Sequence, residues 1–438
     1  MSTTTRMGFT GLATLTLLVA VALPARAQLE VGVAKVDVTP PPGARMYGYG
    51  ARGQEVATGS HDPLWAKAIV LKVGDDALAW VTLDLGYADT PLTTAVRNAV
   101  SPELGLDAIH LTASHTHSGP RFDPAFPEGE ASWAEALPER IAAVIGEAHA
   151  ARTPARLSVD FNRIDVGHNR RRVSIDGRVE MLWENRAGIP TSPVDKRVWV
   201  VAFNTPLDEP IATLVHLAVH PVVLGPDNLE YSADYPGAMV AHVEEEIGGM
   251  ALFLQGAAGD INPFWDKTPL DEGAFEQMTR MGETVGAAAV RIRQGMVFEE
   301  VESLSLGVER VEIGARWDLD DPEIRGSVRA DYLERYERES SAEISTVMIG
   351  PNLALATFPG EFFIEHGLRL SEESIVPTTL FVGYSNGHLG YFPTIKAAAE
   401  GGYGADSSTI VEVGAGERLV DRALINLGYL SGRLSREP

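Results

Sequence analysis

Two histidines placed two residues apart, His115 and His117, are the side chains of this sequence best suited to chemistry. They follow the apolar run Ala108–Ala113, which predicts a buried strand that leads into a Gly-Pro turn. Residues two apart on a strand share a face, so both imidazoles would project together from the end of that strand. Such a pair can hold a transition metal, or divide into one ligand and one proton-transfer group. The simpler alternative is a pair of polar residues that close a loop.

A second histidine pair, His216 and His220, occupies a run that predicts a strand over residues 212–219. That strand would place both side chains on one face, with His220 at its end beside a proline. The apolar neighbours of His216 favour a hydrogen-bonded core histidine over a metal ligand. Asp234 stands at a predicted helix start, where it is an N-cap by default or else a carboxylate that orients a ligating histidine.

Further polar side chains stand in Gly-rich turns. Glu361 lies between a glycine and two phenylalanines, so its carboxylate needs a partner, either a helix N-terminus or a metal. Asp260 and Asn262 follow another apolar run, a pattern that is also typical of ordinary turns. Tyr391 and Tyr403 lie in Gly-rich loops, where most tyrosines pack with a hydrated hydroxyl.

These residues must be positioned by the alternating elements around them. The pattern predicts an α/β fold, a single large layered domain with a mixed β-sheet flanked by helices and the active site in loops at strand ends. We expect helices at residues 133–151, 236–247, 275–294, 362–371 and 417–432. We expect strands at residues 31–38, 66–73, 77–83, 108–113, 156–165, 197–203, 212–219, 251–254, 304–313, 345–349, 353–357 and 379–382. The segment 316–340, dense in charged residues, predicts an exposed helical insertion at the rim of the site.

An export signal is predicted over residues 1–27. Arg6 precedes an apolar run from residue 7 to residue 23, and Ala-Arg-Ala at 25–27 fits a cleavage site. The mature chain, 28–438, would then be secreted or periplasmic. The apolar run is too short for a stable membrane span, and no transmembrane segment is expected elsewhere.

The composition restricts the partners and the kind of metal site. The 438 residues carry a formal charge of −24 that is spread along the chain. Such a surface repels phosphate backbones, which excludes nucleic acid as a partner and disfavours anionic membranes. The sequence has no cysteine, so any metal must be held by nitrogen and oxygen ligands. Nothing in the sequence determines the oligomeric state.

Taken in order, these segments resemble the neutral/alkaline non-lysosomal ceramidase family. The resemblance covers nearly the whole mature chain, although no single motif decides it. The immunoglobulin-like domain that full-length members carry at the C-terminus is expected to be absent. The motifs are Val-Ala-Lys-Val-Asp-Val-Thr-Pro at 33–40, Gly-Tyr-Gly at 48–50, Asp-Leu-Gly at 84–86, the 114–120 stretch, Ala-Val-His at 218–220, Gly-Asp at 259–260, Pro-Gly-Glu at 359–361 and Gly-Tyr at 390–391.

Carried over position by position, the resemblance implies a catalytic Zn²⁺ and an acid/base group beside it. Its zinc ligands would be His115, His220, Glu361 and Tyr391, with His117 as the acid/base group. Arg170 and Tyr403 would be the active-site arginine and the second active-site tyrosine. Water acidified by the zinc would attack the amide of an N-acyl, ceramide-like substrate, small or lipid-like.

One position departs from the family. Ceramidases carry a serine in Gly-Asp-x-Ser-Pro, and Asn262 fills that place here. The amide side chain of asparagine cannot accept an acyl group, so the hypothesis of a zinc hydrolase requires water as the nucleophile. Asn262 would then donate a hydrogen bond near the head of the substrate. Two alternatives stay open: a zinc hydrolase of a different ester or sugar-linked amide, and a non-catalytic secreted binding protein on the same scaffold.

Overall fold

Three β-sheets form the centre of the molecule in the computed structural model, which describes residues 3–4, 27–122, 126, 132–328, 330–338, 340–406 and 408–435. The first sheet has the strand order β5–β4–β3–β1–β6, the second β14–β12–β11–β7 and the third β16–β17–β18–β20. Their bounds are β1 (Leu29–Asp37), β3 (Trp65–Val73), β4 (Asp76–Leu83), β5 (Ala108–Ala113), β6 (Thr153–Pro154), β7 (Arg156–Arg163), β11 (Arg197–Asn204), β12 (Pro210–Leu217), β14 (Met250–Gln255), β16 (Leu304–Glu312), β17 (Ser341–Ile349), β18 (Leu353–Thr357) and β20 (Thr378–Val382).

The three sheets share one hydrophobic core because side chains alternate along their strands. In β4, Leu78 and Trp80 point into this shared core, whereas Val81 and Leu83 point to the opposite face. The second and third sheets show the same period of two and turn residues such as Leu252 and Leu355 inward. Each sheet is therefore apolar on both faces, and its outer face must be covered by another layer.

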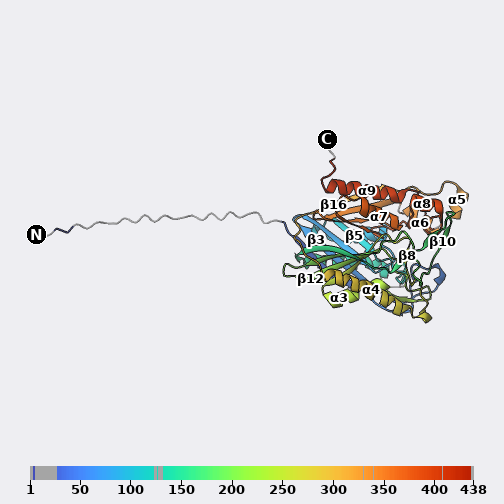
Figure 1. Ribbon diagram of the computed structural model, residues 1–438, viewed down its shortest axis with the longest axis horizontal. Coiled ribbons are helices and arrows are strands. Elements are labelled where there is room, and N and C mark those ends of the chain that lie inside the picture. Colours follow the sequence, from blue (N-terminus) through green and yellow to red (C-terminus); the bar gives the residue numbers. More distant parts are fainter. Residues whose placement is uncertain are drawn as a thin grey trace.

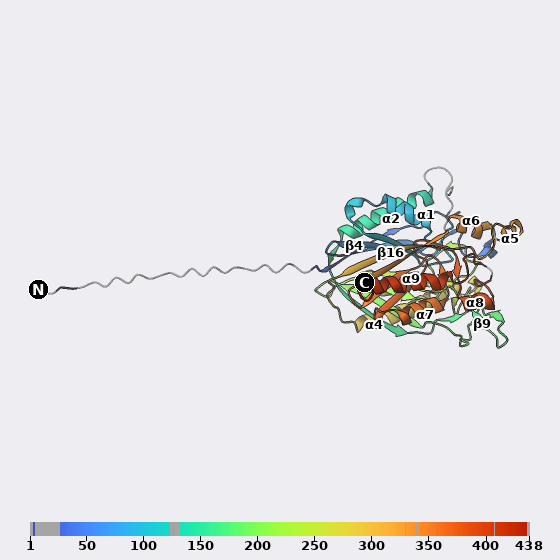
Figure 2. The ribbon, with the colours of Figure 1, turned by 90° about the horizontal axis from the view of Figure 1, so that it is seen from above.

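Helices supply that covering layer, one group for each sheet. α1 (Thr90–Ala99) and α2 (Trp133–Ala150) cover the first sheet, α3 (Tyr235–Ile247) and α4 (Ala274–Gln294) the second, and α7 (Ile364–Glu373) and α9 (Ala415–Leu430) the third. Figure 1 shows α9 on one side of the molecule and α3 and α4 on the opposite side, and Figure 2 shows α1 and α2 on a further side.

Each sheet contains one parallel pair of neighbouring strands. The pairs are β4 with β5, β12 with β14, and β18 with β20, and the other pairings in these sheets are antiparallel. Carboxyl ends of parallel neighbours lie at the same edge of a sheet, and ligands of α/β proteins bind beyond such ends. The loops after these strands carry the polar residues described below.

Smaller elements complete the chain. They are α5 (Pro322–Ser327), α6 (Ala330–Arg338) and α8 (Ile395–Glu400), and the ribbons β2 (Gly59–Ser60) with β13 (Glu230–Tyr231), β8 (Gly167–Asn169) with β15 (Ile261–Pro263), β9 (Arg171–Val173) with β10 (Val179–Met181), and β19 (Glu361–Phe362) with β21 (Tyr391–Phe392).

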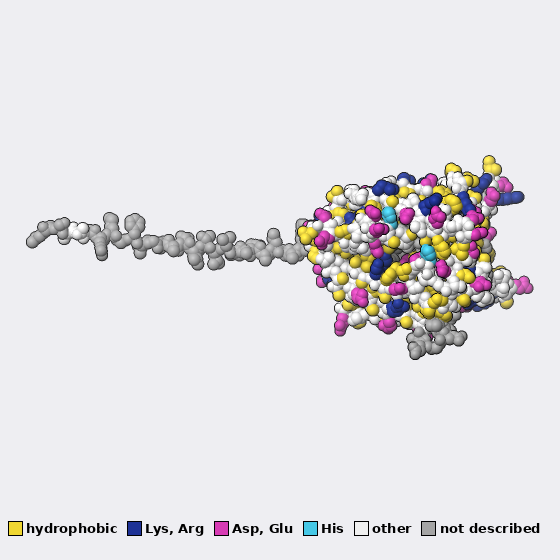
Figure 3. All heavy atoms as spheres, turned by 90° about the horizontal axis from the view of Figure 1, so that it is seen from below, with side chains coloured by type: hydrophobic (Ala, Val, Ile, Leu, Met, Phe, Trp, Pro, Cys, Tyr) yellow, Lys and Arg dark blue, Asp and Glu magenta, His cyan; other side chains and the backbone are white. Residues whose placement is uncertain are grey.

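The expected mixed α/β class is confirmed, with the strands distributed over several sheets. The segment 316–340 contains α5 and α6, as its helical pattern predicted. Helices α1 and α8 and the short ribbons were not predicted. Most of the export signal predicted over residues 1–27 lies outside the described part of the chain. Among the described residues, no helix is both long and apolar enough to span a bilayer. Figure 3 shows acidic and basic side chains interspersed on the face formed by α3 and α4, in line with a charge spread along the chain.

Truncation of a side chain in the shared core should destabilise the fold. Leu252 is fully buried there, so Leu252→Ala leaves a cavity, and we expect a loss of about 2–5 kcal/mol in the free energy of unfolding. Leu207, which is 83 % exposed, provides the matched control, and Leu207→Ala should change stability by less than about 0.5 kcal/mol. Urea denaturation followed by circular dichroism measures both; equal effects would refute the shared core.

Candidate functional site

His115 and His117 lie beyond the strand, not on it. β5 ends at Ala113, and His115 has a φ of +68°, which is left-handed backbone that ends any extended pairing. The interpretation of a common strand face is therefore wrong, and the turn itself brings the two imidazoles together. Their Nε2 atoms are 3.3 Å apart, although the rings are inclined at 78°.

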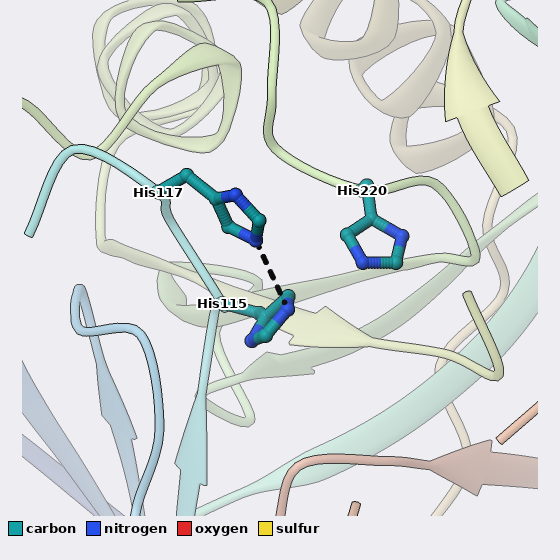
Figure 4. Close-up of side chains that lie close together, drawn as sticks. All are labelled: His115, His117 and His220. Atoms are coloured by element: carbon teal, nitrogen blue, oxygen red, sulfur yellow. Dashed lines mark hydrogen bonds between the residues drawn. The ribbon is translucent and has the colours of Figure 1, made fainter. Parts of the chain in front are cut away.

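The three sheets each deliver one potential ligand to the same point. His115 follows β5 of the first sheet, His220 follows β12 of the second, and Glu361 follows β18 of the third. Glu361 Oε2 lies 3.3 Å from Nε2 of His115 and 3.3 Å from Nε2 of His220. The ligating atoms of His115, His117 and His220 also lie within 4.8 Å of one another, and Figure 4 shows these imidazoles pointing toward one another.

The backbone fixes which nitrogen of each histidine faces the cluster. Nδ1 of His115 lies 2.6 Å from the Gly86 carbonyl, and Nδ1 of His220 lies 3.2 Å from the Ile261 carbonyl. A carbonyl oxygen only accepts hydrogen bonds, so Nδ1 carries the hydrogen in both rings. Each Nε2 of a neutral ring therefore presents a lone pair, as in histidines whose orientation is fixed for metal binding.

These lone pairs face a carboxylate oxygen, which is also an acceptor. Without a cation or additional protons, Glu361 Oε2 and the two Nε2 atoms of His115 and His220 are all hydrogen-bond acceptors. No hydrogen lies between them, so these close contacts are repulsive. Protonation is unfavourable, because burial lowers the pKa of His220 to about 4 and the nearby Arg170 charge adds to that shift. A bound cation satisfies all three groups at once, so the donor set fits a metal.

The spacing also fits zinc. Two ligand atoms at about 2.1 Å from a tetrahedral zinc lie about 3.4 Å apart, close to the distances observed here. Nitrogen and oxygen donors from histidine and glutamate belong to the ordinary ligands of this ion.

His117 differs from the other two histidines. Its Nδ1 is buried, and no described residue accepts or donates a hydrogen bond there, so no bond at Nδ1 fixes its tautomer. Burial lowers the pKa of His117 well below the usual range, because the charged imidazolium loses its hydration there. A Cβ at Gly48 would lie 2.3 Å from the His117 ring, so only glycine allows this approach. His117 can act as a third histidine ligand or as a proton carrier.

Arg170 is brought to the cluster by the β8–β15 ribbon. Its backbone N–H donates to the Asp260 carbonyl, and its guanidinium donates to the Gly259 carbonyl at 2.7 Å and to Asn262 Oδ1 at 3.1 Å. The guanidinium carbon lies 5.1 Å from the Tyr403 ring centroid and 5.5 Å from that of Tyr391. Arg170 therefore holds a fixed positive charge beside the cluster.

Asn262 is fully buried and uses its amide within the protein. Oδ1 accepts from Arg170, and Nδ2 donates to Asp266 Oδ2 at 2.7 Å. Lys267 forms an ion pair with the same Asp266 carboxylate. The structure thus gives Asn262 a role in orienting Arg170, in addition to any contact with a substrate.

Tyr391 lies beside Glu361, because β21 pairs with β19 in parallel. Its ring also lies beside Arg170, whose guanidinium carbon is 5.5 Å from the ring centroid. Burial raises the pKa of Tyr391 well above its usual value, and the Glu361 charge raises it further. The Tyr403 ring packs edge-on against Tyr391 at 5.5 Å. Both tyrosines line the same cavity as His117 and Glu361.

Other candidate residues have structural roles. His216 is buried on β12, and its Nε2 donates to the Phe381 carbonyl at 2.7 Å, as expected for a core histidine. Asp234 caps α3 and accepts from the Tyr235 N–H. Asp260 accepts from the Ile364 N–H and from Asn169 Nδ2, so it joins the Arg170 loop to the start of α7.

Two residues with roles at the site were not recognised in the sequence. Nε2 of Gln255 donates to the carbonyls of Ser114 and Val219, which directly precede His115 and His220. A glutamine at the end of an apolar strand was the available signal. Trp183 packs against both Arg170 and Tyr403, and no local pattern in the sequence indicates that contact.

Comparison with known proteins identifies the family and the fold. The sequence model of the N-terminal region of neutral/alkaline non-lysosomal ceramidases matches residues 29–266. The chain is similar in fold to the neutral ceramidase of Pseudomonas aeruginosa, with a TM-score of 0.75 and 20 % identity over 94 % of this chain and 76 % of that one. A structure of a ceramidase complexed with C2 is also similar, with a TM-score of 0.74 and 20 % identity over the same shares of the two chains.

Removal of one ligand should abolish metal binding. His220→Ala and Glu361→Ala each delete a group that faces His115, so we expect the zinc content to fall from about one ion per chain to less than about a tenth. His216→Gln is the matched control, because His216 is buried on the strand that precedes His220 but lies outside the cluster. Elemental analysis of protein purified without chelator measures the content. Full zinc occupancy in the Glu361 variant would contradict this ligand set.

Proposed function

The chain belongs to the neutral/alkaline non-lysosomal ceramidase family, and we propose that it is an exported zinc-dependent hydrolase that cleaves the C–N bond of an N-acyl substrate. The convergence of His115, His220 and Glu361 carries this proposal, because their facing acceptor atoms call for a cation. The predicted signal over residues 1–27 supports export.

Zinc is the metal that we propose for this site. The chain has no cysteine, so soft thiolate ligands are excluded, and histidine with carboxylate remains. Three protein ligands with a further position open to the cavity are typical of catalytic zinc rather than structural zinc. When bound, zinc would polarise the amide carbonyl and acidify water to a pKa of about 7. Tyr391 would be a fourth ligand or a hydrogen-bond donor to the substrate.

The remaining groups suit the steps of amide hydrolysis. His117 starts neutral, so its Nε2 can accept a proton from the attacking water and return it to the departing amine nitrogen. The amine must be protonated to leave, and His117 can supply that proton, because its Nε2 lies 3.3 Å from Nε2 of His115. Arg170 and the Tyr403 hydroxyl would stabilise the negative charge that develops on the carbonyl oxygen.

Chelation should abolish amide hydrolysis if the proposal is correct. Treatment with 1,10-phenanthroline should reduce fatty-acid release from a short-chain N-acyl sphingosine analogue by about 100-fold or more, and added zinc should restore it. The His216→Gln variant should respond in the same way. Release that persists in protein shown to be free of zinc would contradict the proposal. Release from an ester but not from an amide would reassign the bond that is cleaved.

Asn262 should act on catalysis through Arg170. Arg170→Ala removes a fixed charge from the developing oxyanion, and we expect kcat to fall by about 100-fold or more. Asn262→Ala removes the side-chain acceptor of Arg170 and should lower kcat by about tenfold, with less effect on KM.

A double-mutant cycle tests this dependence. Once Arg170 is absent, Asn262→Ala should cost little more, because the group that Asn262 orients is gone. Additive losses would show that Asn262 acts independently, for example by direct contact with the substrate.

A further inference from the structure

The cavity that opens onto the candidate metal ligands has an unusual lining. Its volume is about 250 Å³, below the range of roughly 300–1,000 Å³ that is usual for sites of drug-sized molecules. Among the described residues around it, Met46 is the one aliphatic side chain larger than alanine. Tyrosines and arginines supply most of the other side chains: Tyr47, Tyr49, Tyr87, Tyr332, Tyr391 and Tyr403, with Arg45, Arg52, Arg121 and Arg335.

Two of these arginines differ sharply in how they are used. Arg52 is buried, and its guanidinium donates to the backbone carbonyls of Tyr47, His117, Asn228 and Gly225. It therefore fixes loops, including the one that carries His117. The Arg335 guanidinium lies against the Tyr332 ring and makes no hydrogen bond or ion pair with any residue that the structure describes.

Arg335 lies on α6, in the charged insertion, and reaches into the cavity. A Cβ added to Gly390, the residue before Tyr391, would lie 3.7 Å from Arg335 Nη1. Its guanidinium carbon lies 5.5 Å from the Tyr332 ring centroid, on the same helix. The positive charge of Arg335 also interacts electrostatically with Glu361 and with the Tyr47 hydroxyl. A guanidinium in this position can pair with an anionic group of a molecule bound at the cluster.

We propose that the substrate is a small polar N-acyl compound that carries an anionic group, and that Arg335 binds this group. The anion belongs to the carboxylate, sulfonate or phosphate class, which an arginine recognises through paired N–H donors. Arg45 and Arg121 lie exposed at the mouth of the cavity, and the described lining carries four arginines against two glutamates, Glu55 and Glu361, so its charge favours anions although the whole chain is acidic.

This inference adds a substrate class to the proposed function, and it rests on that function only for the location of the substrate in this cavity. A ceramide is neutral in its head and carries two long hydrocarbon chains, which require a large apolar surface. The described residues around this cavity are mainly arginines and tyrosines, and they supply little aliphatic surface. A short acyl chain against the tyrosine rings and an anion at Arg335 fit it better.

Two amides of equal size test the proposal. N-hexanoylglycine is anionic at neutral pH, and N-hexanoylglycinamide is its neutral counterpart, so hexanoate release from each reports the preference of the site for charge. We expect wild-type kcat/KM to be at least about tenfold higher for the anionic amide. Arg335→Gln should bring that ratio close to one, and Arg335→Lys should retain part of it. Arg178→Gln, at a side chain that is 87 % exposed, is the control and should keep the full ratio.

Other outcomes would overturn the proposal. Equal or faster turnover of the neutral amide or of a short-chain ceramide would contradict an anionic substrate. A preference that survives in Arg335→Gln would assign the selection to the metal or to another arginine. If zinc is bound but neither amide is hydrolysed, the proposed hydrolysis fails for these compounds. The affinities of the two amides, measured by calorimetric titration, then test the anion site at Arg335. Tighter binding of the anionic amide that depends on Arg335 supports it; equal binding, or none, refutes it.

Discussion

The contact between two histidine lone pairs and a carboxylate oxygen is the constraint on which the rest of the site depends. His115 and His220 each direct Nε2 toward Glu361, because their Nδ1 hydrogens are held by backbone carbonyls. Burial makes this arrangement unfavourable unless a positive charge lies among the three groups. The loops around them therefore have to supply both the orientation of the ligands and the exclusion of water.

The three sheets meet this requirement in the same way. Each ends a parallel pair of strands near the cluster, and one strand of each pair leads into a loop that carries a ligand. Gln255, at the end of a neighbouring strand, donates to the carbonyls just before His115 and His220 and so sets the separation of these two loops. Gly48 packs directly against the His117 ring, where no larger residue would fit. This close contact restricts the movement of the His117 side chain.

Local sequence patterns predicted the elements well and the site only in part. The strand Ala108–Ala113 and the helix at 133–151 are governed by their own apolar periodicity, so their bounds were predicted to within a residue. The distribution of strands over three sheets depends on which faces pack together, and that information is spread over the whole chain. The left-handed turn at His115 and the approach of Arg335 to the cavity likewise depend on contacts between residues far apart in sequence. The resemblance to a family predicted the candidate ligands as one set. It did not predict the residues that orient these ligands, such as Gln255.

The distribution of the ligands over three sheets has a consequence for the folding of a chain without cysteines. A cation bound to His115, His220 and Glu361 would link three segments that are far apart in the chain, as disulfides link distant segments in secreted proteins. Closing long loops in this way removes conformational entropy from the unfolded chain, and a metal that binds only the folded state adds its binding free energy to stability. The ion would thus be a reversible cross-link, and the concentration of free metal would shift the balance between folded and unfolded molecules.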